Sequence, residues 1–145
     1  MARGNKANRD AFLSIEAEAK ELLRHLHPAL QRMNKIDRMD GAGAEMRRAA
    51  YAIIREFHIA YFCKDARDEH IRQMIGWYGH LQAALEISCQ QGILAEGFKL
   101  PIAMRMERIE EGIRKWYNSR HTQRQARDQC TRPEADGGGP AGDYE

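Results

Sequence analysis

The chain has 145 residues and a formal net charge of +2, with 43% hydrophobic and 30% charged residues. This length and composition fit one domain with a single hydrophobic core. They exclude a membrane-spanning segment, because no apolar run approaches the roughly 20 residues that cross a bilayer, and no hydrophobic signal segment follows Met1. We therefore expect a soluble, cytoplasmic protein.

The amino-acid types favour helices and a reducing compartment. Alanine, leucine, isoleucine, methionine, arginine and glutamate dominate and valine is absent, which is typical of helices rather than sheets. The three cysteines, Cys63, Cys89 and Cys130, lie far apart and form no Cys-x-x-Cys pair. The sequence therefore predicts reduced thiols, with neither a disulfide framework nor a zinc site.

Charge is unevenly distributed along the chain. Residues 133–145, PEADGGGPAGDYE, carry four acids and no base, so the preceding residues carry a net charge of +6. A basic body indicates a polyanionic partner, although a solvated charged surface gives the same balance. We expect residues 128–145 to form a disordered acidic tail.

The N-terminal part predicts one long helix after a flexible start. Residues 1–9 are polar and lack periodicity, so we expect them to be flexible. From Asp10 the apolar residues recur every three or four positions, which is the pattern of an amphipathic helix. Pro28 lies inside this helix and removes one backbone hydrogen bond, so we expect a kink there. The apolar stripe consists of Phe12, Ile15, Ala19, Leu22, Leu26, Leu30 and Met33.

A connector rich in turn-forming residues, 34–43, precedes the second predicted helix. The apolar face of that helix consists of Met46, Ala50, Ile53, Phe57 and Ala60. Three arginines, Arg47, Arg48 and Arg55, lie mostly off this face, so we expect them on the outside of the helix. Arg48 is placed to pair with Glu45.

The third predicted helix follows Cys63, with Asp65 as its N-cap. Its wide apolar face, which we expect to be largely covered, comprises Ile71, Met74, Ile75, Tyr78, Leu81, Leu85 and Ile87. Gly92 is the predicted C-terminal stop. The fourth helix begins between Ala95 and Pro101, since proline is well tolerated in a first turn.

The fourth helix carries an apolar stripe that becomes basic without changing its period. The stripe runs through Ile102, Met106, Ile109, Ile113 and Trp116 and continues as Arg120, Arg124 and Arg127. A helix that leaves a packed core and presents the same face to a polyanion has this pattern, and so has a solvated helix end. Four amphipathic helices with short links predict an all-α fold, an antiparallel up-and-down four-helix bundle over residues 10–127.

The sequence carries no motif of a phosphate loop, a serine hydrolase or a dinucleotide site, and its six histidines lack metal-ligand spacing. We therefore expect no metal and no cofactor. One enzymatic alternative stays open. Arg114 and His121 match the R-x(4–6)-H spacing of the HEPN ribonucleases, in which both residues assist RNA cleavage, although Lys115 stands where that family usually has Asn, Asp or His.

The order and spacing of several residues resemble the four-helix-bundle family that contains the accessory variability determinant (Avd) of diversity-generating retroelements. The resemblance covers about residues 20–120. Its landmarks are Pro28, Arg38, Gly43, Met46, Ala49, Ala60, Leu81, Gly92, Leu94, Ile109 and Trp116. A second branch of the same superfamily, encoded in intervening sequences of ribosomal RNA genes, is a second interpretation.

The resemblance implies an adaptor rather than an enzyme. Avd-type proteins form a pentameric barrel of bundles with a basic surface. They bind the retroelement's reverse transcriptase and its template RNA, and they support error-prone copying of that RNA. The residues expected to contact nucleic acid are Arg120, Arg124 and Arg127 first, and Arg47, Arg48 and Arg55 second.

The chain also departs from the family pattern. Met33, Asn34 and Lys35 replace the usual Phe-Pro-Lys or Phe-Pro-Arg, Glu86 stands where an arginine is common, and Arg114 and Lys115 replace paired small residues. The first and third departures alter the helix ends. Glu86 reverses the charge in the middle of the third helix.

Overall fold

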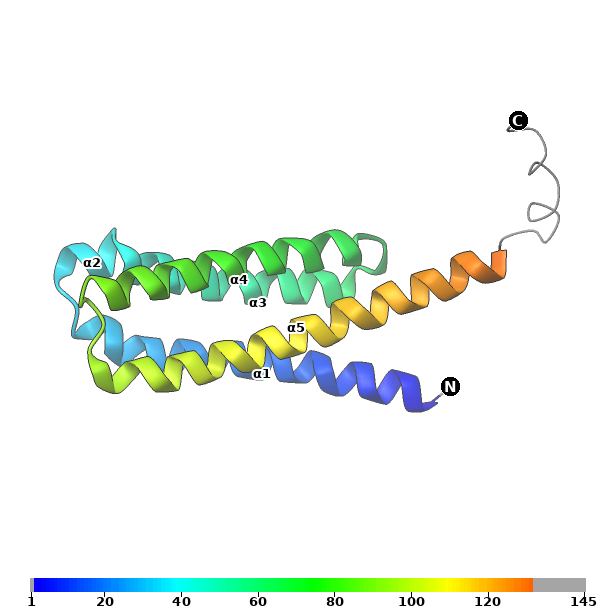
Figure 1. Cartoon of the computed structure of the whole chain (residues 1–145), viewed down its shortest axis with the longest axis horizontal. Coiled ribbons are helices and arrows are strands. Elements are labelled where there is room, and N and C mark those ends of the chain that lie inside the picture. The colour runs from blue at the N-terminus through cyan, green and yellow to red at the C-terminus, as the bar shows by residue number, and fades with distance from the viewer. Residues whose placement is uncertain (1, 132–145) are drawn as a thin grey trace, which may run out of the picture.

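The structure, a computed structural model, describes the backbone of residues 2–131 and the side chains of residues 14–122 and 125–127. This part of the chain contains helices and no strand. The elements are α1 (Ala2–Gln31), α2 (Lys35–Met39), α3 (Ala42–Phe62), the 3-10 helix η1 (Lys64–Ala66), α4 (Arg67–Gln90) and α5 (Glu96–Thr131). The four long helices lie side by side, with the α3–α4 turn at one end and the α1–α3 and α4–α5 connections at the other (Figure 1). The predicted all-helical bundle is confirmed.

The core lies between the four long helices. Helix α1 packs on α3 and α5, α3 packs on α4, and α4 contacts α5. The apolar stripes predicted for the first, second and fourth helices are buried, apart from Phe12, whose side chain is outside the described residues. Burial of each large aliphatic side chain contributes about 1.5 to 3 kcal/mol, so the three-four pattern is the main reason for the fold.

Helix α4 is less covered than the sequence predicted. Ile71, Met74 and Leu81 are buried, but Ile75 and Ile87 are 42% and 44% exposed. The α4–α5 contact is smaller than the α1–α3, α1–α5 and α3–α4 contacts, and Ile75 borders an open groove between α4 and α5. The expectation of a largely covered face is therefore wrong for Ile75 and Ile87.

Two features near the helix ends differ from expectation. The connector 34–43 contains the short helix α2, in which the Asn34 Oδ1 accepts a hydrogen bond from the backbone N–H of Asp37 at 2.8 Å. Such a cap satisfies a backbone donor that the first turn leaves free. The prediction that Asp65 is the N-cap of α4 is wrong. Asp65 lies within η1, and Ala66 precedes α4 without a side-chain cap.

Gly92 ends α4 as predicted. Its φ angle of +67° lies in the left-handed region, where glycine meets no steric penalty. The N–H of Ile93 donates to the carbonyl of Ser88 at 2.9 Å, and the N–H of Gly92 donates to that of Cys89 at 3.3 Å. These two bonds form a Schellman motif, which satisfies carbonyls of the last helical turn.

The long helices extend beyond their predicted bounds. Helix α1 begins at Ala2 rather than Asp10, and α5 continues to Thr131. Pro101 lies in the second turn of α5 rather than in its first. Residues 132–145 of the predicted acidic tail are outside the described residues. Within residues 2–131, no helix is both long enough and apolar enough to cross a bilayer.

Candidate nucleic-acid interface

The arginines predicted on the outside of α3 line one groove together with aromatic and apolar side chains. Arg47, Tyr51 and Arg55 follow one another at four-residue spacing and therefore share a face of the helix. Tyr51 is 60% exposed, and Trp77 of α4 packs partly against the core at the edge of the groove. The other lining residues are Met39, Ala44, Arg48 and Ala52. We call this surface the α3 groove.

The α3 groove keeps an excess of positive charge. Arg48 pairs with Glu45 at 2.7 Å, as predicted, and Arg55 lies 3.4 Å from Glu56. His80 hydrogen-bonds Glu45 at 2.8 Å, and this bond is the largest reason why the pKa of Glu45 lies below its ordinary value. Arg47 has no ion pair among the described side chains. It is therefore the arginine of the groove with the least competition for a phosphate.

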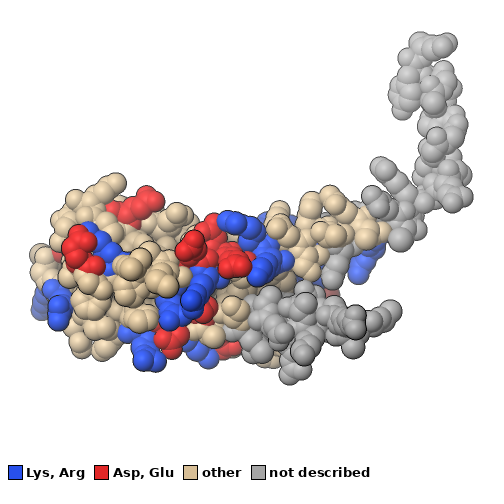
Figure 2. All heavy atoms as spheres, turned by 60° about the horizontal axis from the view of Figure 1, so that its bottom comes forward, with Lys and Arg blue, Asp and Glu red and all other residues tan. Residues whose placement is uncertain are grey.

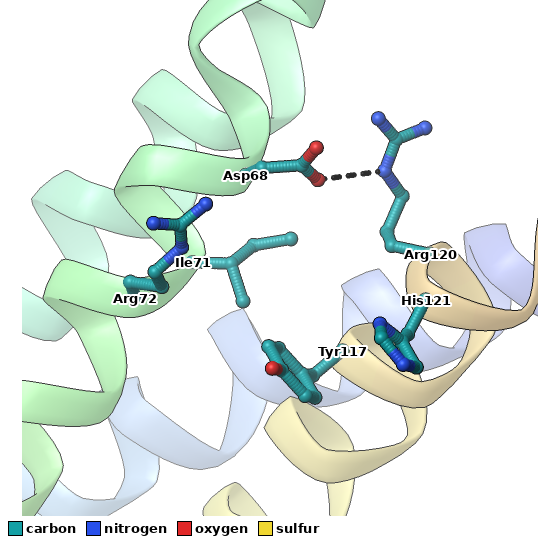
Figure 3. A pocket seen from close by; sticks show the side chains of 6 residues that line it. All are labelled: Asp68, Ile71, Arg72, Tyr117, Arg120 and His121. Carbon is teal, nitrogen blue, oxygen red and sulfur yellow. Dashed lines mark hydrogen bonds and ion pairs between the residues drawn. The ribbon is translucent and has the colours of Figure 1, made fainter. Parts of the chain in front are cut away.

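The basic end of α5 is arranged differently from the simple extension that the sequence suggested. Arg120 is only partly exposed and donates from Nε to Asp68 of α4 at 3.1 Å (Figure 3). Arg127 is exposed, whereas the side chain of Arg124 is outside the described residues. Arg120 therefore lies on the inner stripe of α5, where it forms an ion pair with α4. A role for all three arginines in nucleic-acid binding stays a prediction.

Arg67, which the sequence did not single out, joins the end of α3 to the start of α4. Its guanidinium donates to the carbonyls of Ala60 and Tyr61 at 2.8 and 3.0 Å and lies 5.9 Å from the ring centre of Trp116. Burial lowers the pKa of Arg67, and the nearby charge of Arg120 lowers it further. Arg67 therefore has a structural role, because it satisfies carbonyls at the C-terminal end of α3.

The two residues of the ribonuclease alternative lie two turns apart on α5. Arg114 pairs with Glu110 at 2.6 Å. The ring of His121 lies parallel to that of Tyr117, with 6.2 Å between ring centres, and its Nε2 is 3.2 Å from the Gln125 amide nitrogen. Arg114 and His121 border neighbouring grooves that share Tyr117, and the ribonuclease alternative stays a prediction.

The side of the molecule that α1 and α5 form has mixed charge. In Figure 2, which brings this side forward, basic and acidic side chains alternate rather than gather by sign. Arg105 and Arg108 both pair with Glu18, at 2.9 and 3.5 Å, and Lys115 pairs with Glu111 at 3.0 Å. Such neutralised surfaces attract a polyanion weakly, so the α3 groove is the better candidate interface.

Three histidine–glutamate pairs join neighbouring helices. His58 of α3 lies 3.2 Å from Glu16 of α1, His80 of α4 pairs with Glu45 of α3, and His70 of α4 hydrogen-bonds Glu56 of α3. No spacing along the chain indicates these pairs, because the partners lie 14 to 42 positions apart. No group of three histidine, cysteine or carboxylate side chains within the described residues is placed to hold a metal ion.

Tyr78 makes a pH-dependent contact between α4 and α5. Its hydroxyl donates to Glu110 at 3.1 Å, and burial, followed by the charge of Glu110, raises the pKa of Tyr78 above its ordinary value of 10.0. A raised pKa in the folded state means that the contribution to stability is complete below pH 10 and is lost as the pH rises further. We therefore expect wild type to lose more stability than Tyr78→Phe between pH 9 and about 11.5.

Urea denaturation of both proteins across this range measures the difference. At neutral pH the variant is expected to be about 1 kcal/mol less stable, because it lacks one partly buried hydrogen bond. The difference between the two proteins should shrink above pH 10. A constant difference across the range would contradict the assigned contact.

Comparison with known proteins leaves the chain without an assigned family. No protein-family model, no curated protein and no solved structure matches it. The resemblance to Avd-type proteins therefore stays an expectation from the sequence.

Proposed function

We propose that the chain is a nucleic-acid-binding adaptor without catalytic activity and that the α3 groove binds RNA. The observation that carries the proposal is the meeting of Arg47 and Arg55 with the exposed ring of Tyr51 in one groove. Arginines neutralise phosphates, and an exposed aromatic ring stacks on a base of any identity. Together they are typical of surfaces that bind single-stranded RNA with little sequence preference.

Within this proposal the α3 groove is the main contact and the end of α5 is secondary. Arg120 is already paired with Asp68, whereas Arg47 has no acidic partner among the described side chains. A phosphate that approaches Arg47 therefore displaces water rather than a carboxylate. This lower competition favours binding at the groove.

The resemblance to Avd-type proteins extends the proposal to a biological setting. On that basis the adaptor belongs to a diversity-generating retroelement and binds the reverse transcriptase and its template RNA during mutagenic copying. It would act as a cytoplasmic homopentamer of antiparallel up-and-down bundles. A ring of five subunits presents the α3 groove five times, and such repetition raises the avidity for one RNA strand.

Replacing Arg47 and Arg55 together with glutamine is expected to weaken binding of single-stranded RNA and to flatten its salt dependence. Each phosphate contact contributes about −0.7 to the slope of log affinity against log salt, so the slope should lose about 1.4 units. Tyr51→Ala is expected to weaken binding about tenfold with an unchanged slope, because stacking is worth about 1 to 3 kcal/mol per base. Fluorescence anisotropy with a 5′-hydroxyl RNA, over a salt series, measures both quantities.

Matched controls separate the groove from general electrostatics. Arg24→Gln removes an exposed arginine on α1, and Tyr117→Ala removes an exposed ring on α5; both should bind this RNA like wild type. Equal losses in the controls, or no RNA affinity at low salt, would contradict the proposed surface. Light scattering on the same samples tests the oligomer, since a pentamer has five times the mass of one chain. RNA cleavage that His121→Ala abolishes would favour the ribonuclease alternative.

A further inference from the structure

A second basic pocket lies between α4 and α5. It has a volume of about 350 Å³, which is at the small end of the range for ligand sites. Its lining residues are Asp68, Ile71 and Arg72 of α4 and Tyr117, Arg120 and His121 of α5. In Figure 3 the two helices face each other across this space, with Arg72 on one side and Arg120, His121 and Tyr117 on the other.

Asp68 orients the Arg120 side chain in this pocket but accepts a hydrogen bond only from its Nε. Asp68 accepts from Nε at 3.1 Å, and the two terminal nitrogens of the guanidinium point away from that bond (Figure 3). A guanidinium carries five N–H donors, so Arg120 retains donors for an anion while it keeps Asp68. Since its side chain is only 33% exposed, less conformational freedom remains to be lost on binding.

The pocket also carries more positive than negative charge. Arg72 forms no ion pair among the described side chains, and Asp68 is the sole carboxylate among the residues lining the pocket. The two arginines and Asp68 therefore give the lining a net charge of +1. Arg67 adds a further positive charge near Arg120. An anion that entered the pocket would meet donors from both helices.

We infer that this pocket binds a phosphomonoester, with Arg72 and Arg120 donating to its oxygens from opposite helices. A phosphomonoester carries a charge of about −1.5 to −2 at pH 7 and three terminal oxygens, which match this charge and this spread of donors. The parallel rings of Tyr117 and His121 provide an aromatic wall for the organic group that carries the phosphate.

A nucleoside monophosphate and the 5′-terminal phosphate of an RNA present the same chemical group. The inference does not depend on RNA binding in the α3 groove, because the two surfaces share no residue.

Isothermal titration of the full chain with inorganic phosphate and with adenosine monophosphate tests the inference. We expect saturable binding by wild type and a loss of about tenfold in Arg72→Gln, an exposed residue whose replacement leaves the core intact. Asp68→Asn should bind several-fold more tightly, because it removes the competing charge while its amide oxygen still accepts from Arg120. Arg24→Gln, and the Arg47 and Arg55 double variant of the α3 groove, should bind like wild type.

A 5′-phosphorylated RNA trinucleotide and its 5′-hydroxyl form identify the source of the phosphate. In the Arg47 and Arg55 double variant, whose α3 groove is expected to add little RNA affinity, binding of the phosphorylated form more tightly than adenosine monophosphate points to an RNA end, and equal binding points to a free nucleotide; each outcome fits a phosphomonoester site. Equal binding of the two trinucleotides would overturn the inference. So would a folded wild type that takes up no phosphate at about 10 mM, or the same loss in Arg24→Gln as in Arg72→Gln.

Discussion

Replacing His70 with alanine is expected to lower the free energy of unfolding by about 2 to 4 kcal/mol, because it leaves a buried carboxylate without its main partner. Glu56 is 3% exposed, and His70 hydrogen-bonds its Oε2 across the α3–α4 interface. Arg55, which is largely exposed, lies 3.4 Å from the Glu56 carboxylate. With its side-chain amide turned so that the nitrogen faces Glu56, Gln73 donates to both carboxylate oxygens at 3.2 Å. Chemical denaturation at pH 7 measures the loss.

His80→Ala is a matched control for this prediction. The His80–Glu45 pair joins the same two helices, but its side chains are 46% and 32% exposed. Water replaces a lost partner at such a site, so we expect a cost below about 1 kcal/mol. In a Glu56→Leu background, His70→Ala should cost much less than in wild type, because no buried carboxylate is left unpaired. Equal costs for His70→Ala and His80→Ala would show that burial of Glu56 does not set the energy.

Gly43→Ala is expected to destabilise the fold by about 2 kcal/mol, the usual cost of an added methyl group in a packed site. Gly43 lies in the first turn of α3, where the chain crosses the ends of α1 and α2. A Cβ there would meet the Met33 Sδ at 2.5 Å, and the Asp37 backbone carbonyl and the Leu30 Cδ2 both at 2.8 Å. The sulfur and the methyl group can turn aside, but the carbonyl is fixed by the backbone. Thermal denaturation measures the loss.

Gly76→Ala provides a control of opposite sign. Gly76 also lies within a helix, α4, but a Cβ there meets nothing within 4 Å. Alanine has the higher helix propensity, so this variant should gain up to about 1 kcal/mol. A stabilised Gly43→Ala would contradict the close approach of α3 to α1 and α2.

The candidate site was only partly predictable from the sequence. The position of Arg47 and Arg55 outside the core follows from helical periodicity, because the buried face of α3 is marked by Ile53 and Phe57. The sequence did not reveal that Trp77 lies at the edge of the same groove. That neighbour depends on how α4 packs against α3, which periodicity alone leaves open.

The surroundings of the basic stripe on α5 were also not predictable from the sequence. The sequence placed Arg120 on the inner face of the helix and suggested a nucleic-acid contact. In the structure that face still meets α4, and Asp68 partly neutralises the arginine. Asp68 and Arg120 are 52 positions apart, so no spacing along the chain indicates the pair.

The helices, most of the core and the glycine stop at Gly92 follow from the sequence alone, because these depend on the three-four periodicity and on local backbone conformation. Which charged and aromatic side chains meet depends instead on how the helices pack against one another. The burial of Glu56 against His70, the grouping of Arg47 with Trp77 and the pocket between Arg72 and Arg120 all arise where two helices approach each other. Each helix fixes the direction of its own side chains, but its partner and its rotation are set by packing of the shared core.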